Sequence, residues 1–126
     1  MSYDLSGLFR AVQAALWLNP RVTLYSLARQ LGVERHTIER ATRAVTGKSY
    51  RGYQQQALFE RACKMLSGDP LRSIKEVAFD LRFSSPRSFA RFVRRMSGLS
   101  PSETRRKLAA NAKTVPHSSK KSGPTC

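Results

Sequence analysis

The amino-acid sequence predicts an all-α fold of about seven helices. Apolar residues recur at three- and four-residue spacing through nearly the whole chain, and no stretch shows the apolar–polar alternation of a half-buried strand. Capping residues divide this periodic pattern, because serine or threonine precedes most apolar runs and glycine follows them. The 126 residues, 40% of them hydrophobic, suffice for one domain or two very small ones.

Three helices are expected in the first part of the chain. The first is amphipathic and ends where a proline interrupts the pattern, and the second opens on a threonine N-cap. Glycines end the second and the third helix. The expected helices are Leu5 to about Asn19-Pro20, Thr23 to Gly32, and about Glu34 to Gly47.

Four further helices are expected in the rest of the chain. The first of them is the longest in the sequence and is ended by a Gly-Asp-Pro segment. A serine–glutamate capping box opens the next one, and a serine followed by proline opens each of the last two. The expected helices are Ser49 to Ser67, Ser73 to about Leu81, Ser85 to Gly98, and Ser100 to about Ala112.

This order predicts two homeodomain-like helix-turn-helix subdomains joined by a long linker helix. The two units are loosely similar, and each has an alanine, Ala28 or Ala78, early in its first helix. Two helices that cross near a right angle need such a small side chain at closest approach. The expected divisions are 5–48 for the first unit, 49–67 for the linker helix, 70–112 for the second unit and 113–126 for a disordered basic tail.

The charge is strongly basic and unevenly distributed. There are 23 Lys and Arg against 8 Asp and Glu, a formal net charge of +15. Residues 1–63 hold nine basic and four acidic side chains, and residues 64–126 hold fourteen and four. Such a balance favours a polyanionic partner. It also fits a non-specific nucleic-acid-binding protein, chromatin-like or RNA-associated, or a module whose basic face meets an acidic protein.

Compartment and chemistry follow from motifs that the sequence lacks. Cys63 and Cys126 do not form a disulfide framework, so a reduced, intracellular protein is expected. The apolar run from Leu5 to Leu18 contains Arg10 and is too short for a membrane span. No HxxxH, CxxC or glycine-rich phosphate loop occurs. We expect a cytoplasmic, nucleoid-associated protein that is not an enzyme and needs no cofactor, metal or membrane.

The second helix of the second unit carries the strongest functional pattern. In a helix-turn-helix this helix enters the major groove, with its N-terminal residues at the base edges. Arg87, Ser88 and Arg91 occupy that position, and arginine can donate two hydrogen bonds to guanine O6 and N7. Arg94 and Arg95 lie one turn further on and are expected to contact phosphate. The alternative is a solvated basic face.

The equivalent helix of the first unit is expected to read bases through Arg35, His36, Glu39 and Arg40. Glu39 either accepts a hydrogen bond from cytosine N4 or pairs with Arg43 on the same helix. His36 either contacts DNA or is an ordinary exposed histidine. The residues expected to contact phosphate in the two units are Thr23, Arg43, Lys48, Ser73, Ser85, Arg94 and Arg95.

A long, gapped motif runs through the second unit. It comprises IKEVA at 74–78, FSSP at 83–86, FARF at 89–92, GLSPSE at 98–103 and Arg105. With these residues the chain resembles the DNA-binding domain of the AraC/XylS family of bacterial transcription regulators. The likeness extends more weakly over about residues 5–110, through 26–32, 38–40 and Gly47. It implies two helix-turn-helix units in successive major-groove segments on one face of bent DNA. By position it points to Arg35, His36, Glu39 and Arg40, then to Pro86, Arg87, Ala90 and Arg91.

Several residues depart from the pattern of that family. Glu34 stands in place of a serine cap, Ala41-Thr42 in place of an anchoring phenylalanine, Leu58 in place of an arginine, Arg82 in place of a turn glycine, and Thr104 in place of an aromatic residue. A left-handed backbone at the turn would cost an arginine about 1 kcal/mol. We expect the first unit to be less rigid, or to read DNA less strictly, than the second.

The expected function is sequence-specific transcription regulation through binding to double-stranded DNA, with RNA polymerase as a candidate protein partner. An effector-binding or dimerisation domain does not fit in the chain, since the first helix begins near its start and the tail is short and polar. The chain is then either a stand-alone two-headed regulator or a fragment of a longer protein. No small-molecule effector is expected in this chain, and a stand-alone form is expected to bind DNA as a monomer.

Overall fold

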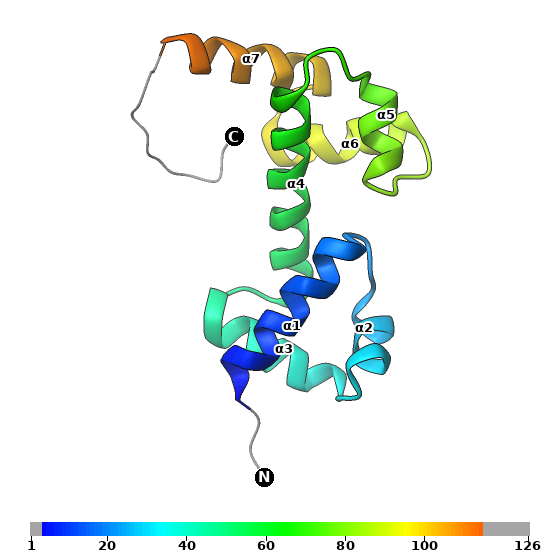
Figure 1. Cartoon of the computed structure of the whole chain (residues 1–126), viewed down its shortest axis with the longest axis vertical. Coiled ribbons are helices and arrows are strands. Elements are labelled where there is room, and N and C mark those ends of the chain that lie inside the picture. Colours follow the sequence, from blue (N-terminus) through cyan, green and yellow to red (C-terminus); the bar gives the residue numbers. More distant parts are fainter. Residues whose placement is uncertain (1–3, 115–126) are drawn as a thin grey trace. The chain divides into compact units, whose positions relative to one another are not determined.

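The computed structural model describes residues 4–114, which form helices and no strand (Figure 1). This confirms the all-α prediction, and the helix bounds agree with the expected ones to within about two residues. The helices are α1 (Leu5–Leu18), α2 (Leu24–Leu31), α3 (Arg35–Thr46), α4 (Tyr50–Gly68), α5 (Ile74–Asp80), α6 (Pro86–Ser97) and α7 (Pro101–Thr114). Among these described helices, none is long and apolar enough to cross a membrane.

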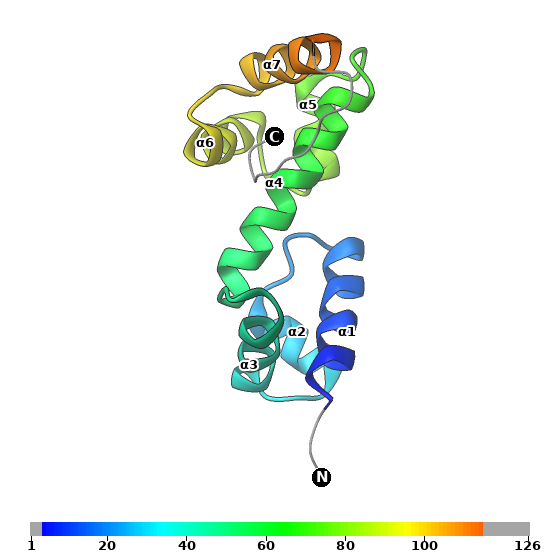
Figure 2. The ribbon, with the colours of Figure 1, turned by 90° about the vertical axis from the view of Figure 1, so that its left-hand side faces the viewer.

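The described residues divide into two compact units, with the division between Ala57 and Leu58. Figures 1 and 2 show α1, α2 and α3 gathered with the start of α4, and α5, α6 and α7 gathered with its end. The division falls inside α4, so the expected linker helix supplies residues to both units. The finer divisions at 5–48, 49–67 and 70–112 stay a prediction, and most of the expected tail (113–126) lies outside the described residues.

The expected capping residues fix the helix ends. Thr23 Oγ1 accepts a hydrogen bond from the backbone N–H of Ser26 at 3.1 Å and so opens α2. Ser73 and Glu76 form the expected capping box of α5, with both hydrogen bonds at 3.0 Å. A glycine with a positive φ ends each of α2, α3 and α6. These ends are decided by local sequence, which is why the pattern predicted them.

The turn between the two helix-turn-helix helices has the same backbone in both units. Gly32 has φ 70° and Arg82 has φ 69°. The following residue, Val33 or Phe83, donates its N–H to the carbonyl of the early alanine, at 3.1 and 3.0 Å respectively. Both alanines are buried, as the helix crossing requires. The second unit thus holds an arginine in the left-handed conformation that the first unit gives to a glycine.

The core of the first unit lies between α1, α2, α3 and the start of α4. Tyr50, in the first turn of α4, is buried, and its hydroxyl donates to the Val22 carbonyl at 2.7 Å. Gln54 donates to the same carbonyl at 2.7 Å, which ties α4 to the segment between α1 and α2. Burial raises the pKa of Tyr50, so its hydroxyl stays a donor. The buried cluster comprises Phe9, Val12, Ala15, Leu16, Val22, Leu27, Ala28, Ile38, Ala41 and Tyr50.

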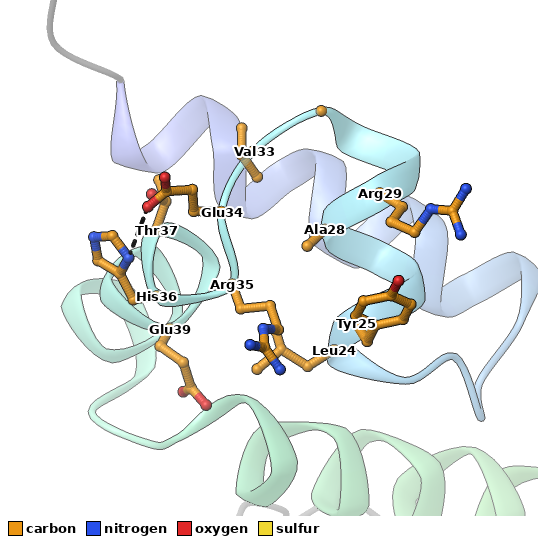
Figure 3. A pocket seen from close by; sticks show the side chains of 11 residues that line it. Leu24, Tyr25, Ala28, Arg29, Val33, Glu34, Arg35, His36, Thr37 and Glu39 are labelled. Atoms are coloured by element: carbon orange, nitrogen blue, oxygen red, sulfur yellow. Dashed lines mark ion pairs between the residues drawn. The ribbon is translucent and has the colours of Figure 1, made fainter.

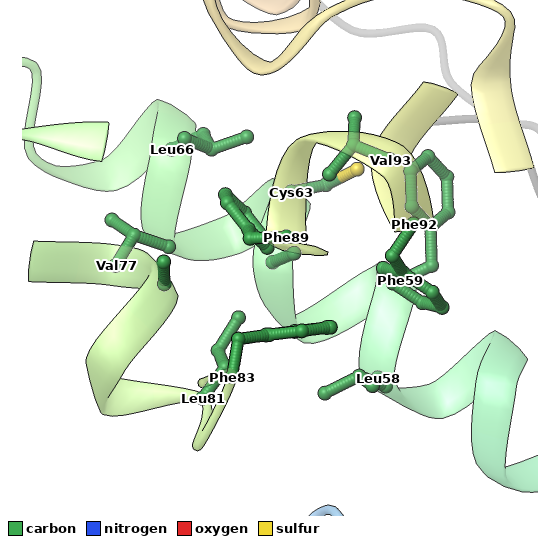
Figure 4. Close-up of a cluster of buried hydrophobic side chains, with 12 residues drawn as sticks. Leu58, Phe59, Cys63, Leu66, Val77, Leu81, Phe83, Phe89, Phe92 and Val93 are labelled. Carbon is green, nitrogen blue, oxygen red and sulfur yellow. The ribbon is translucent and has the colours of Figure 1, made fainter. Parts of the chain in front are cut away.

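The core of the second unit is rich in phenylalanine (Figure 4). The Phe83 ring lies 5.2 Å from that of Phe89 and 5.4 Å from that of Phe92, measured between centroids. Phe59 of α4 meets Phe92 edge to face at 6.4 Å. Two buried phenylalanines, Phe89 and Phe92, thereby fix how α6 is rotated about its axis. The whole buried cluster comprises Leu58, Phe59, Ala62, Cys63, Leu66, Val77, Ala78, Leu81, Phe83, Phe89, Phe92 and Val93.

Cys63 lies on the α4 face that packs into this cluster and is 5% exposed. Cys63 is disulfide-bonded rather than a free thiol, so the reduced state expected from the sequence is wrong for this residue. The number and spacing of two cysteines do not distinguish a bonded cysteine from a free one, and that is where the expectation failed. Cys126 lies outside the described residues.

Two residues at the start of α7 join it to the rest of the second unit. The Nε of Arg105 donates to the Leu66 carbonyl at 2.8 Å. Carbonyls in the last turn of a helix have no partner within that helix, so Arg105 caps the end of α4. Thr104, one of the departures from the resembled pattern, in which an aromatic residue is frequent at this position, is 3% exposed. The position is therefore a core position that a smaller side chain occupies here.

Candidate nucleic-acid interface

One face of α3 is buried and the other is exposed and basic. The buried side chains are Thr37, Ile38, Ala41 and Thr42, and the exposed basic ones are Arg35, His36, Arg40 and Arg43. The structure therefore brings three of the expected base-reading residues and one expected phosphate contact onto one solvent-facing surface. Their roles toward DNA stay a prediction.

The start of α3 is held less firmly than the starts of the neighbouring helices. Glu34 is the N-cap residue, but its side chain makes no capping hydrogen bond. Its carboxylate instead lies 3.2 Å from Nδ1 of His36, with both side chains exposed. The departure at Glu34 thus leaves the first turn of α3 without a side-chain cap and gives His36 an intramolecular partner.

Glu39 has a structural role that the sequence reasoning missed. Its Oε1 accepts a hydrogen bond from the backbone N–H of Tyr50 at 2.8 Å, at the first residue of α4. Ser49 Oγ accepts from the N–H of Gly52 at 3.1 Å, so two side chains together cap α4. Of the two alternatives for Glu39, the pairing with Arg43 is replaced by this contact. The contact with cytosine stays a prediction for the remaining carboxylate oxygen.

α6 presents the most basic of the helix faces. Phe89, Phe92 and Val93 are buried, and the opposite face holds the exposed Arg87, Arg91, Arg94 and Arg95. Unlike α3, the helix contains no acidic residue. The guanidinium of Arg95 lies over the Phe92 ring at 5.7 Å from its centroid, which limits its orientations. The phenylalanines that anchor α6 thus also determine which way its arginines face.

The first turn of α6 is closed by two serines. Ser85 Oγ accepts from the N–H of Ser88 at 3.1 Å, and Ser88 Oγ accepts from the N–H of Ser85 at 3.3 Å. Ser88 Oγ also donates to the Ser85 carbonyl at 3.0 Å. Ser88, an expected base-reading residue, is therefore half-buried and engaged in capping. Pro86 is exposed at the first helical position and Ala90 is half-buried on the next turn.

The other expected phosphate contacts lie at helix ends. Thr23, Ser73 and Ser85 are the N-cap residues of α2, α5 and α6, and each accepts a backbone N–H through its side-chain oxygen. Such a hydroxyl can still donate its proton to a phosphate oxygen. Lys48 is exposed in the connection between α3 and α4. The sites are compatible with phosphate contact, which stays a prediction.

An open groove of about 1120 Å³ lies between α2 and α3 (Figure 3). It holds Arg35, His36 and Glu39, three of the expected base-reading residues. It also holds Tyr25 and Arg29 of α2, which the sequence reasoning did not single out. The lining residues are Leu24, Tyr25, Ala28, Arg29, Gly32, Val33, Glu34, Arg35, His36, Thr37 and Glu39.

The exposed faces of α3 and α6 are rich in hydrogen-bond donors. Guanidinium groups dominate them, and arginine has five donors, no acceptor and a permanent charge. Within residues 4–114 no group of three or more His, Cys, Asp or Glu side chains could hold a metal ion. The arrangement suits phosphate oxygens and the acceptor edges of bases.

Comparison with known families identifies the chain's family. A family model described as a helix-turn-helix domain matches residues 27–107, from within α2 to within α7. The chain belongs to the AraC-type helix-turn-helix family. This family consists of DNA-binding transcription regulators. A comparison with curated protein sequences found no match.

The AraC-type fold is also present in similar solved structures. The DNA-binding domain of AdpA, a global transcriptional factor solved in complex with a target DNA, has a TM-score of 0.69. It is 26% identical, over 93% of this chain and 100% of that one. The C-terminal domain of AraT, a response regulator from Geobacillus stearothermophilus, has a TM-score of 0.70 at 21% identity, over 83% and 86% of the two chains. An AraC-type transcriptional regulator from Chromobacterium violaceum has a TM-score of 0.63 at 23% identity, over 82% and 96%.

Two further departures of this AraC-type chain from the family pattern, at Leu58 and at Ala41-Thr42, have a packing explanation. Leu58 is 5% exposed within the core of the second unit, where an apolar side chain is suited. Ala41 and Thr42 are fully buried in the first unit. The hydroxyl of Thr42 donates to the Ile38 carbonyl at 2.8 Å, so its burial leaves no unpaired donor.

Proposed function

We propose that this AraC-type chain regulates transcription by binding a specific DNA sequence, with α3 and α6 inserted into successive major-groove segments. The observation that carries the proposal is the phasing of α6. Its exposed arginines lie opposite two buried phenylalanines, and its first turn is closed by Ser85 and Ser88. A helix held this firmly can present its arginines to base edges with little loss of backbone conformational freedom.

The residues of α6 divide into two roles under this proposal. Arg87 and Arg91 lie one turn apart near the N-terminus of the helix, the end that meets base edges, and each would bind guanine O6 and N7. Arg94 and Arg95 lie in its last turn and would contact phosphate. In α3 the corresponding readers would be Arg35, His36, Glu39 and Arg40, with Arg43 and Lys48 on phosphate.

The likeness to AdpA supports duplex DNA as the partner. That domain is solved with a target DNA. All of the AdpA domain matches 93% of this chain, at 26% identity. We further propose that each helix-turn-helix unit acts as a separate reader within the divisions 5–48 and 70–112. The protein would bind as a monomer in the cytoplasm, at the nucleoid, with RNA polymerase as a candidate partner.

Selection of bound sites from random duplex DNA tests the proposal. A conserved site recovered after selection, read in two segments about one helical turn apart, is the expected result. In competition at physiological salt, the protein should bind that site about 10³-fold or more tightly than it binds random duplex. Equal binding of the selected and random duplexes would refute sequence-specific reading. It would leave non-specific nucleic-acid binding, the function that the charge of +15 alone favours.

A further inference from the structure

The exposed face of α2 carries an aromatic–guanidinium pair that does not contribute to the core. Tyr25 is 58% exposed. The guanidinium of Arg29, one turn later, lies over the Tyr25 ring at 5.9 Å from its centroid. Both side chains border the groove that contains Arg35 and His36, and Figure 3 shows Arg29 extending outward from α2. They are therefore neighbours of the base-reading face of α3.

The corresponding face of the second unit differs in charge. Counted from the N-caps Thr23 and Ser73, Tyr25 and Arg29 correspond to Lys75 and Phe79. α2 contains no acidic residue, whereas α5 contains Glu76 and Asp80. The fold thus accepts a phenylalanine where the first unit has Arg29, so packing does not dictate an arginine there. The face of α2 suits a polyanion better than that of α5 does.

We infer that Tyr25 and Arg29 bind the sugar–phosphate backbone of the DNA strand that borders the groove segment read by α3. This inference rests on the proposed function and deepens it. In a helix-turn-helix the first helix crosses the backbone while the second lies in the groove, which brings the exposed face of α2 to the phosphates. The Arg29 guanidinium would donate to phosphate oxygens, and the Tyr25 hydroxyl would donate to the same phosphate or a neighbouring one. The ring of Tyr25 would hold Arg29 in place.

The two units would therefore contribute differently to DNA binding. Backbone contacts position a protein on DNA without distinguishing sequence. Tyr25 and Arg29 would compensate for the uncapped start of α3 by binding α2 firmly to the duplex. The first unit would then contribute mainly affinity, and α6 would contribute mainly sequence discrimination.

The test compares Arg29→Ala with Arg10→Ala, which removes the same charge from an exposed position on α1. Binding of the full chain to the selected duplex and to random duplex would be followed by fluorescence anisotropy at several salt concentrations. Arg29→Ala should weaken binding to both duplexes by about tenfold. It should also reduce the slope of log affinity against log salt concentration by about one. Arg10→Ala should change either affinity by less than about twofold. Circular dichroism would establish that both variants keep their helix content.

Two further variants separate charge from geometry. Arg29→Lys keeps the charge without the planar fork and should recover part of the affinity and all of the salt slope. Tyr25→Phe keeps the ring that supports Arg29 and removes only the hydroxyl, so about threefold weaker binding to both duplexes is expected.

Two results would overturn the inference. One is an Arg29→Ala protein that binds as the Arg10→Ala protein does. The other is weakening that is confined to the selected duplex, since this would make Arg29 a base reader. If the wild-type protein did not prefer the selected duplex, the proposed function would fail. The comparison of Arg29→Ala with Arg10→Ala on random duplex would still decide the backbone contact.

Discussion

Replacing Arg82 by glycine should stabilise the second unit, although it deletes a side chain and adds none. Arg82 has φ 69°, in the left-handed region, where a residue with a Cβ is less stable by about 1–2 kcal/mol. Glycine removes that strain but loses more backbone entropy on folding, by about 0.5–1 kcal/mol. The expected net gain for Arg82→Gly is therefore about 0.5–1 kcal/mol. That gain corresponds to a rise of about 2–8 °C in the thermal midpoint of a unit this size.

Two control variants show whether the backbone is the cause. Arg82→Ala deletes the guanidinium but keeps the strained φ, so its thermal midpoint should stay close to that of the wild type. Gly32→Ala places a Cβ at the matching turn of the first unit, where nothing lies within 4 Å of it. Only strain at φ 70° then acts, and a loss of about 0.5–1 kcal/mol is expected.

Thermal unfolding followed by far-UV circular dichroism measures all three variants. An Arg82→Gly protein less stable than the wild type would refute the reasoning, because the arginine side chain would then contribute more than its backbone strain costs. Equal stabilisation by Arg82→Ala and Arg82→Gly would also refute it. In that case relief of charge repulsion in a protein of net charge +15 would be the cause.

Three more predictions concern a cap of α4, the arginines of α6 and a carboxylate at the start of α7. Glu39→Ala should lower the free energy of unfolding by about 1 kcal/mol in urea denaturation because α4 loses a cap, whereas Glu39→Gln keeps an acceptor oxygen and should lose less. Wild-type stability in both Glu39 variants would contradict this role. Arg87→Ala should remove about 1–3 kcal/mol of binding discrimination at one base pair, whereas Arg94→Ala should weaken binding to all sequences alike. Affinities for duplexes with single base-pair changes measure both effects. The same pattern for both arginines would be evidence against the assigned roles. The backbone N–H of Ser100 lowers the pKa of Glu103 below its ordinary value of 4.5, so the stability from this carboxylate is present above about pH 4.5 and is lost as the pH falls through the lowered pKa. Glu103→Gln should therefore flatten the acid side of a stability–pH curve, and an unchanged curve would contradict it.

The sequence predicted what short segments decide by themselves. The capping box at Ser73 and Glu76, and the serine-proline start of α6, involve residues three positions apart or fewer. Their hydrogen bonds form whenever the helix forms, so they can be recognised without a fold. The rotation of α6 was predictable for the same reason, because Phe89 and Phe92 recur at helical spacing.

Contacts between distant segments were not predictable in this way. Glu39 caps a helix that begins 11 residues later, and Arg105 donates to a carbonyl of α4 that lies 39 residues earlier. Each is a charged residue on a helix, and its local sequence fits a solvated side chain equally well. Only the packing of α3 on α4, or of α7 on α4, brings a free backbone group within reach. The Tyr25–Arg29 pair was missed for a different reason, since a single exposed tyrosine forms no motif.

The two proposed recognition helices, α3 and α6, differ in how well their first turns are ordered in the unbound protein. The first turn of α6 is fixed by the reciprocal bonds of Ser85 and Ser88, and Phe89 holds it to the core. The first turn of α3 has no side-chain cap, although Arg35 and His36 project from it. An uncapped turn must lose conformational freedom on binding, and that loss subtracts from the affinity for every sequence. The departures from the AraC-type pattern therefore favour α6 as the source of discrimination, and they leave α3 dependent on contacts that hold the first unit to the backbone.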